Sequence, residues 1–378
     1  MDRRALLLGA GSLLGLAATA TVTETAQAAP DSPAGPLGIV NVADHGAKGA
    51  RGGDDTAAIN AAIAAVAARD VSGDATGIVW FPAGLYSSAA PLLVPRNIKL
   101  VGESMEASKL VYTGPKGTAP FLTFGTPGTI NTNSGVIGMQ VNAAAKLPWA
   151  VLMYGPQEGS RISGAHICGG TTGGVDVRSA GIEGGCNKFV IDRGTWVWTS
   201  GDGGMYGLKF DDANGPLAIR DVTVVGTERT GAPPADSAGL HFNGGIQHVT
   251  NVNVERFESH TSIDGWSNFQ GDTLSAYGGV SNYIRRRRFE GADPSVRYSV
   301  ANLDSSGSVG TCIKDEHAGI TIQSTRAYSN RDIDSSAWNG PHMTMGTFHL
   351  WVDSSGRLRM KASAPASDTD GAVVGTQN

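Results

Sequence analysis

Adjacent carboxylates in GLKFDDANG, Asp211 and Asp212, have the residue types and spacing best suited to chemistry in this chain. Asp192 precedes them in VIDRG, and Asp236 and His241 follow them in ADSAGLHFNGG. Paired carboxylates serve glycoside hydrolysis, in which one holds a proton as the acid and the other is the base or nucleophile. These five residues are therefore the predicted catalytic candidates. The alternative is structural, because Asp is also common in turns.

A polysaccharide lyase would need different chemical groups. β-Elimination from a uronic acid needs a base and a group that neutralises the sugar carboxylate, either Ca²⁺ or an arginine. Asp211 and Asp212 would then supply oxygen ligands for Ca²⁺. No spacing singles out a base among the candidates by type, which are Lys209, Arg220, Arg256, His248 and His260. Hydrolysis is slightly favoured and needs no cofactor, so Ca²⁺ is expected only if the chain is a lyase.

Aromatic and basic side chains near these carboxylates are candidates for substrate binding. Flat aromatic rings fit the C–H face of a sugar, and tryptophan adds a polar handle. The predicted substrate-binding residues are Lys209, Trp196, Trp198, Arg256 and Trp266. The basic run YIRRRRFEG, residues 283–291, either engages an anionic polysaccharide or is a solvated junction. Packing between neighbouring elements is the alternative role for the aromatic residues.

The elements that must position these residues form a loose repeat. Short β-like runs start near residues 136, 162, 190, 219 and 249, at spacings of 26, 28, 29 and 30. In four of the five, an apolar residue is followed by others three and five places on, as in Val136, Met139 and Val141. Such a period with glycine-rich turns indicates a β-solenoid, in which residues one coil apart lie within about 5 Å. A β-sandwich with coincidental spacing is the alternative.

One helix is predicted, over residues 54–69, with Ile59, Ile63 and Val66 on one face. Either Asp54 or Asp55 would cap its first turn, so this second carboxylate pair is interpreted as structural. A solenoid exposes an unpaired, apolar coil at each end. The helix is expected to cover the first coil.

Residues 41–104 carry four motifs in order: DHGAKG, the DDT helix start, FPAGLY and KLVGE. This stretch resembles the opening of the pectate-lyase-like right-handed parallel β-helix superfamily, which includes polygalacturonase-related proteins and phage tailspikes. The resemblance implies an all-β, single-stranded right-handed parallel β-helix with an N-terminal capping helix, and a carbohydrate ligand. The polygalacturonase order of Asp, Asp-Asp and His on successive coils is similar to Asp192, Asp211-Asp212 and His241. That family's Asn-Thr-Asp, Gly-His-Gly and Arg-Ile-Lys motifs are absent here.

The chain divides into segments of different character. Arg3-Arg4, an apolar run and AQAA at 26–29 predict a secretory signal of the twin-arginine type, and hence a secreted, extracellular protein with no membrane segment after cleavage. Alternating apolar residues around DSSG in 347–363 predict a hairpin. The predicted segments are a signal peptide at 1–28, a leader at 29–40, the β-helix at 41–290 and a small C-terminal β module at 291–378, which resembles tailspike-like C-terminal segments.

Composition narrows the function classes further. The net charge of -5 gives no general case for nucleic acid binding. Three cysteines exclude a dense disulfide framework and leave open whether Cys168 and Cys186 are bridged or are buried thiols. No CxxC or HExxH pattern argues for zinc. Two hypotheses remain. One is a secreted enzyme that degrades a polysaccharide, either neutral or anionic. The other is a non-catalytic, tailspike-like carbohydrate-binding homotrimer.

Overall fold

The computed structural model describes residues 38–50, 53–69, 77–179, 185–200, 204–211, 215–227, 232–264, 267–277, 280, 282–287, 296–305, 311–316, 320–323, 342–345, 348–363 and 365–376. The chain divides into Met1–Pro33 and Ala34–Asn378, and every described residue belongs to the second unit. The predicted signal peptide and most of the predicted leader lie outside the described residues. Within the described part, no helix is long and apolar enough to cross a membrane.

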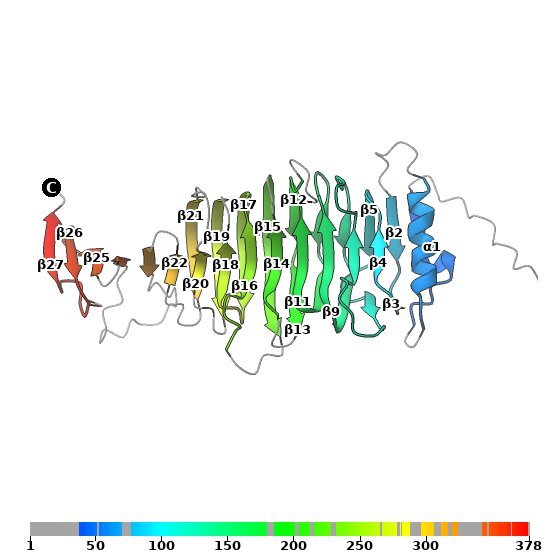
Figure 1. The fold of residues 1–378 in the computed structure, drawn as a ribbon, viewed down its shortest axis with the longest axis horizontal. Helices are drawn as coiled ribbons and strands as arrows, with labels where there is room; N and C mark the ends of the chain where they lie inside the picture. The colour runs from blue at the N-terminus through cyan, green and yellow to red at the C-terminus, as the bar shows by residue number, and fades with distance from the viewer. Residues whose placement is uncertain are drawn as a thin grey trace, which may run out of the picture. The chain divides into compact units, whose positions relative to one another are not determined.

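The predicted capping helix is present. It is α1 (Thr56–Ala67), and it follows a short 3-10 helix, η1 (Val42–His45). Ile59, Ile63 and Val66 are buried, and α1 lies against β1 and β2 at the start of the strand stack (Figure 1). The apolar face of the helix thereby covers the first coil of the β-helix, whose strand edge would otherwise be unpaired.

Asp54 and Asp55 are structural, as the sequence predicts, but they have different hydrogen-bond partners. The Asp54 carboxylate accepts a hydrogen bond from the Thr56 N–H at 3.1 Å. Hydrogen bonds from the side chain and backbone of Thr56 lower the pKa of Asp54. Asp55 is buried and accepts from the backbone N–H groups of Lys48 at 2.8 Å and Ser87 at 3.2 Å. Asp55 therefore fastens the start of the helix to two neighbouring segments of the chain.

Three parallel ladders of strands form the body of the molecule (Figure 1). The first ladder contains β1 (Ile39–Asn41), β2 (Gly77–Phe81), β5 (Ile98–Gly102), β8 (Gly135–Ile137), β10 (Arg161–Ser163), β12 (Phe189–Asp192) and the first halves of β15 (Pro216–Thr227), β17 (Ile246–Glu255), β19 (Ser267–Tyr277) and β21 (Val296–Ser305). The second contains β3 (Gly84–Ser88), β6 (Ser108–Tyr112), the first parts of β9 (Gln140–Tyr154) and β11 (His166–Arg178), β13 (Thr195–Ser200) and the second halves of β15, β17, β19 and β21.

The third ladder contains β4 (Leu92–Val94), β7 (Leu122–Phe124), the second parts of β9 and β11, β14 (Tyr206–Asp211), β16 (Ala238–Asn243), β18 (Ser259–Ile263), β20 (Asn282–Arg286) and β22 (Thr311–Asp315). Each coil passes through the three ladders in turn, and each strand pairs in parallel with its equivalents on the coils before and after it. The fold is the predicted parallel β-helix.

The predicted repeat follows from one left-handed residue at each corner. Val136 pairs with Ile162, and the same buried position recurs at Ile219 and Val249 on later coils. Two residues after each of these, the backbone has positive φ: Gly138, Gly164, Asp221 and Asn251 at 60°, 55°, 56° and 51°. A single left-handed residue delays the strand alternation by one place, so the next inward side chain comes after three residues instead of two.

The fourth member of the repeat, which fits the predicted pattern only by spacing, has a longer corner. Its buried residue in register is Ile191, one place after the predicted start at 190. Two left-handed residues follow it, Arg193 and Gly194, with φ of 59° and 68°. The extra residue moves the next inward apolar side chain of the second ladder to Val197, which is fully buried.

The β-helix ends in antiparallel strands. β22 pairs antiparallel with β23 (Ile320–Gln323), followed in the same manner by β24 (His342–Met345), β25 (Phe348–Val352), β26 (Arg357–Lys361) and β27 (Ala372–Thr376). The predicted hairpin at 347–363 is the β25–β26 pair. Parallel pairing continues through β21 and β22, beyond the predicted boundary at residue 290, and the change to antiparallel pairing comes after Asp315.

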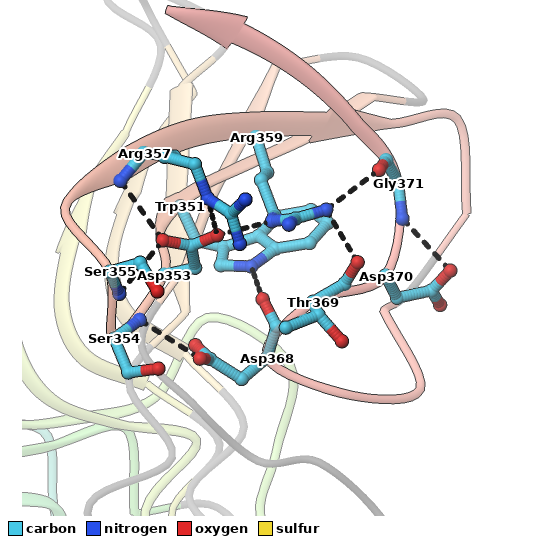
Figure 2. A network of polar contacts seen from close by, with 10 residues as sticks. All are labelled: Trp351, Asp353, Ser354, Ser355, Arg357, Arg359, Asp368, Thr369, Asp370 and Gly371. Atoms are coloured by element: carbon cyan, nitrogen blue, oxygen red, sulfur yellow. Dashed lines mark hydrogen bonds and ion pairs between the residues drawn. The ribbon is translucent and has the colours of Figure 1, made fainter. Parts of the chain in front are cut away.

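The two faces of this terminal sheet differ in chemistry. On one face, buried Asp353 accepts hydrogen bonds from Arg357 Nε at 2.9 Å and Arg359 Nε at 2.6 Å (Figure 2). Burial alone would raise the pKa of Asp353, but hydrogen bonds from both arginines and from backbone N–H groups lower it overall. Phe348, Val352 and Leu358 are exposed apolar residues of the same hairpin, and Val352 pairs with Leu358.

Candidate functional site

The outer face of the third ladder carries two rows of polar side chains. Phe210 and Phe242 point inward, because their rings stack 5.1 Å apart and each lies near a core phenylalanine of the first ladder. The residues on either side of them therefore point outward. One row runs through the paired residues Asp176, Lys209, His241, Ser262 and Arg285. The other row runs through Arg178, Asp211, Asn243, Asp264 and Arg287. We call these two rows the carboxylate face.

Asp211 and Asp264 occupy the same register in the second row, two coils apart. Asp211 pairs with Asn243, and the N–H of Asp264 bonds the carbonyl of Phe242, which places Asp264 beside Asn243 on the next coil. Strands in a sheet are about 4.8 Å apart, so two coils separate the backbones by about 9.5 Å. Asp211 and Asp264 therefore extend from the sheet side by side, with Asn243 on the strand between them.

Asp264 is placed to hold a proton. Burial raises its pKa, and the negative charges of Asp211 and Asp236 act in the same direction, whereas Arg287 and Arg285 oppose them. The Nη1 atom of Arg287 lies 3.6 Å from the Asp264 carboxylate, whose side chain is still 27% exposed. Asp264 is therefore reachable from solvent and titrates above the usual range of a carboxyl group.

Asp211 has a different environment. Its carboxylate forms an ion pair with Lys209, from the other row of the same strand, and its side chain is 33% exposed. The ammonium group of Lys209 also lies 6.0 Å from the centre of the Tyr206 ring. Lys209 thus fixes the position of the Asp211 carboxylate and leaves part of it open to solvent.

His241 lies between the two carboxylates and is buried. Burial and the positive charges of Lys209 and Arg287 lower its pKa, to about 4, against the opposing effect of Asp211. The ring packs 4.7 Å from the Tyr206 ring, and Nε2 is 3.7 Å from Asp264 Oδ2. His241 is therefore a neutral imidazole near neutral pH, suited to hydrogen bonding rather than to carrying charge.

Asp176 begins the first row and is fully buried. It accepts hydrogen bonds from Arg178 at 2.9 Å from Nε and 2.6 Å from Nη2. Burial raises its pKa, and Arg178 counters that effect. Sequence reasoning missed Asp176. The signal that could have found Asp176 is its position in VDVR. It is an acidic residue between two valines of a strand.

Asp236 belongs to a neighbouring charge cluster centred on Arg285. The guanidinium of Arg285 lies 2.7 Å from Asp236, 2.7 Å from Glu258 and 2.9 Å from Glu316. Arg285 belongs to the basic run at 283–291, whereas Glu258 was missed because it belongs to no motif. Through Arg285, the cluster continues the first row beyond Ser262. The negative charge of Asp236 raises the pKa of Asp264.

The structure does not bring all of the predicted site residues together. Asp192 ends β12 in the first ladder, where it pairs with Arg161 at 3.2 Å and Arg220 at 3.5 Å. The expectation that Asp192 shares a face with Asp211 is thus corrected, because the two residues are 19 positions apart, which is less than one coil and leads to a different ladder. The residue that pairs one coil before Lys209 is Asp176.

The remaining candidates are dispersed. Trp196 and Trp198 lie on β13 in the second ladder, and Arg256 is an exposed residue with φ of 61° in the turn after β17. Asp212 and Trp266 lie outside the described residues. Cys168 and Cys186 are both buried free thiols, so the bridge left open by the sequence is not formed.

Several buried polar atoms of the carboxylate face have no hydrogen-bond partner among the described residues. They are Asp176 Oδ1, His241 Nδ1, Ser262 Oγ and Asp264 Oδ1. Buried polar atoms are normally paired, and exceptions call for a water molecule, an ion or a functional role. These four atoms lie in the two rows that carry Asp211 and Asp264, and this face is therefore the candidate site.

Comparison with known proteins gives matches at both ends of the chain. Residues 39–136 match a family model described as rhamnogalacturonase A/epimerase, pectate lyase-like, and residues 301–376 match one described as capsule depolymerase. No curated protein gives a match.

Solved structures with similar folds are distant in sequence. A tailspike of an Acinetobacter phage is 11% identical with a TM-score of 0.51, and the match covers 80% of this chain and 48% of the tailspike. A DFA-IIIase from Arthrobacter chlorophenolicus is 12% identical with a TM-score of 0.49, over 74% of this chain and 81% of that one. The A-module of a mannuronan C-5 epimerase from Azotobacter vinelandii is 13% identical with a TM-score of 0.35, over 73% and 97%. This chain spans about half the length of the tailspike.

Proposed function

We propose that this chain, which folds as a parallel β-helix and matches a pectate-lyase-like family model over residues 39–136, degrades a polysaccharide as a glycoside hydrolase whose active site is the carboxylate face. The observation that carries the proposal is the placement of Asp211 and Asp264 in one register, two coils apart. One carboxyl group is held by a lysine, and the other has a raised pKa. Carboxyl groups in contrasting environments are the mark of an acid and base pair.

In the proposed reaction, Asp264 is the general acid. It donates its proton to the glycosidic oxygen as the bond to the leaving sugar breaks. Asp211 takes a proton from a water molecule, which attacks the opposite face of the sugar ring. The two backbones are about 9.5 Å apart, so carboxyl groups that extend side by side from them are proposed to leave room for this water molecule, as in inverting glycosidases. The reaction is therefore proposed to invert the anomeric configuration.

Other residues of the face assist these two. Neutral His241 lies with Nε2 3.7 Å from Asp264 Oδ2 and helps to position that carboxyl group. Arg287 holds the carboxylate that Asp264 becomes after proton transfer, from 3.6 Å away. Lys209 keeps Asp211 in position and, with Arg287, gives the face positive charges that suit a substrate carrying carboxylates.

Lyase chemistry is the alternative reaction on the same face. Lys209 and Arg287 would neutralise a uronic acid carboxylate without a metal. Among the described residues, no group of three His, Cys, Asp or Glu side chains is placed to hold an ion. Asp211 is also engaged by Lys209. Asp212, the other predicted Ca²⁺ ligand, lies outside the described residues, and the mechanism proposed here uses no step through Ca²⁺.

A non-catalytic carbohydrate-binding homotrimer remains a second candidate function. The exposed apolar residues Phe348, Val352 and Leu358 of the terminal hairpin favour it, because such side chains are suited to an interface between copies of the chain. Assembly does not conflict with catalysis. With either function, we propose that the protein acts outside the cell, where capsule and wall polysaccharides are found.

The test is a set of digestions with polygalacturonate, alginate, hyaluronate and uncharged glycans. A hydrolase releases reducing ends without unsaturated sugars, whereas a lyase releases unsaturated uronides that absorb ultraviolet light. Release of reducing ends alone, lost in Asp264→Asn, supports the proposal. Cleavage of none of these polymers would favour the binding protein.

A further inference from the structure

An aromatic platform lies on the outer face of the second ladder, away from the carboxylates of the third. Trp196 and Trp198 are two residues apart on β13, and buried Val197 between them points into the core. Their rings stack with centres 5.7 Å apart and planes at 29°. The Trp196 side chain is 43% exposed, and it is the one exposed aromatic side chain in the described part of the β-helix.

A histidine on the preceding coil holds the platform in place. His166 pairs with Trp196 and packs edge-on against both rings, with centres 6.2 Å from Trp196 and 4.7 Å from Trp198. Burial lowers the pKa of His166, so the imidazole is neutral and packs as an uncharged ring. The tryptophans are thereby presented as a fixed surface, and binding them costs little side-chain ordering.

Polar groups flank the rings without partners. Trp198 Nε1, His166 Nε2 and Asn253 Oδ1 are buried and have no hydrogen-bond partner among the described residues. Asn253 belongs to the same outward row as Trp196, two coils further along, with Thr223 between them. The exposed ring of Trp196, in a row that continues through the half-buried side chains of Thr223 and Asn253, has the character of a sugar-binding surface, in which an aromatic face meets C–H groups and polar side chains meet hydroxyls.

We propose that this platform is a second polysaccharide-binding site, distinct from the carboxylate face, which takes an uncharged sugar residue of a longer chain. The inference rests on the proposed function only in taking a polysaccharide as the ligand. The neighbours of Trp196 and His166 in their row, Thr223 and Gln140, carry no charge. The acid of the adjacent row, Glu255, accepts a hydrogen bond from Asn253 at 2.8 Å. The platform therefore binds sugar and does not cleave it.

The experiment is native electrophoresis through gels that contain laminarin, dextran, polygalacturonate or alginate. We expect laminarin or dextran, the uncharged polymers, to retard the protein, and we expect Trp196→Ala to weaken the retardation about tenfold; retardation by polygalacturonate or alginate alone would overturn the assignment of an uncharged sugar. Trp196→Phe keeps a ring and should restore most of the binding. Leu93→Ala, which shortens an equally exposed apolar side chain of the β-helix, should behave as the unchanged protein does. Circular dichroism of each variant confirms that it is folded.

Two further measurements separate this proposal from the proposed function. Asp211→Asn should bind the gel polymer normally while it loses cleavage. Trp196→Ala should cleave short oligosaccharides at the normal rate. Loss of short-chain cleavage in Trp196→Ala would place the residue in the active site and overturn a separate platform. Equal retardation of Trp196→Ala and the unchanged protein, or no retardation by any polymer, would also overturn it. Trp196-dependent retardation without cleavage of any glycan would leave the platform standing and remove the hydrolase.

Discussion

Asp211 and Asp264 extend from the same register of the third ladder on strands two coils apart, with Asn243 between them. The stacking of coils, rather than any local motif, creates this relationship. The two residues are 53 positions apart in the chain, and their separation is set by the spacing of strands in a sheet. The proposed division into base and acid follows from what surrounds each carboxyl group.

Replacing the proposed acid should remove most of the activity. Asp264→Asn keeps the shape of the side chain but cannot donate the proton, so we expect kcat to fall about 10² to 10⁴-fold. Because the pKa of Asp264 is raised, the unchanged enzyme should lose activity as the pH rises through that pKa, and the variant should lack this limb. Rates measured across pH check both effects. Asp221→Asn, an exposed carboxylate at a corner, is the matched control and should leave the profile unchanged.

Two buried histidines should make the fold sensitive to acid. Burial lowers the pKa of His241 and of His260 to about 4, below the value of about 6.5 in an unfolded chain. The unfolded chain therefore binds more protons between these values, and the free energy of unfolding should fall as the pH drops from about 6.5 to about 4. The expected loss is on the order of 3 kcal/mol for each histidine.

Denaturant unfolding at a series of pH values measures this slope. His260→Asn should be less stable at neutral pH, because Nε2 of His260 donates to the Val252 carbonyl at 3.1 Å, and its unfolding should depend less on pH. His248→Gln, an exposed histidine on the first ladder, should not alter the slope. An unchanged slope in His260→Asn would contradict the assignment.

The left-handed corner at Asn251 should tolerate glycine but not valine. Asn251 has φ of 51°, and its side-chain amide donates to Asp221, the equivalent residue one coil earlier, at 2.7 Å. A β-branched residue is strained at positive φ and also loses this hydrogen bond, so Asn251→Val should destabilise the protein by about 2 kcal/mol. Asn251→Gly removes the hydrogen bond without the strain. Midpoints of denaturant unfolding that are equal for the two variants would show that the corner is not strained.

The terminal hairpin should determine the assembly state. If Phe348, Val352 and Leu358 form an interface, the unchanged protein should have the mass of a homotrimer in solution, and Val352→Glu should shift it to a monomer. Light scattering on a sizing column measures the mass. Ser367→Glu adds the same charge at another exposed position of the module and should leave the trimer intact. A monomeric unchanged protein would rule out the trimer.

The sequence predicts the scaffold well, because its signals are local and repeated. Val136, Met139 and Val141 are the buried residues around one corner of a coil. Later coils repeat this spacing, so the period can be detected even though the loops vary in length. The helix start at Asp54-Asp55 is likewise a local signal. The capping helix, the parallel β-helix and the hairpin around DSSG are all confirmed.

The candidate site is less predictable, since it depends on how many residues each coil contains. Ser262 follows its partner His241 by 21 residues, whereas His241 follows Lys209 by 32. A single period therefore assigns Asp192 to a face that it does not share and overlooks Asp264, which stands in SIDGW without a motif. Burial, which raises the pKa of Asp264, depends on packing between coils and leaves no trace in the local sequence.

The central claim is most directly tested by the anomeric configuration of the first product. Proton NMR during digestion of a cleaved glycan should show new reducing ends whose configuration is inverted relative to the bond that was broken, with none formed by Asp211→Asn or Asp264→Asn. Retained configuration, unsaturated sugar products, or undiminished rates in both variants would contradict the assignment of Asp211 as base and Asp264 as acid.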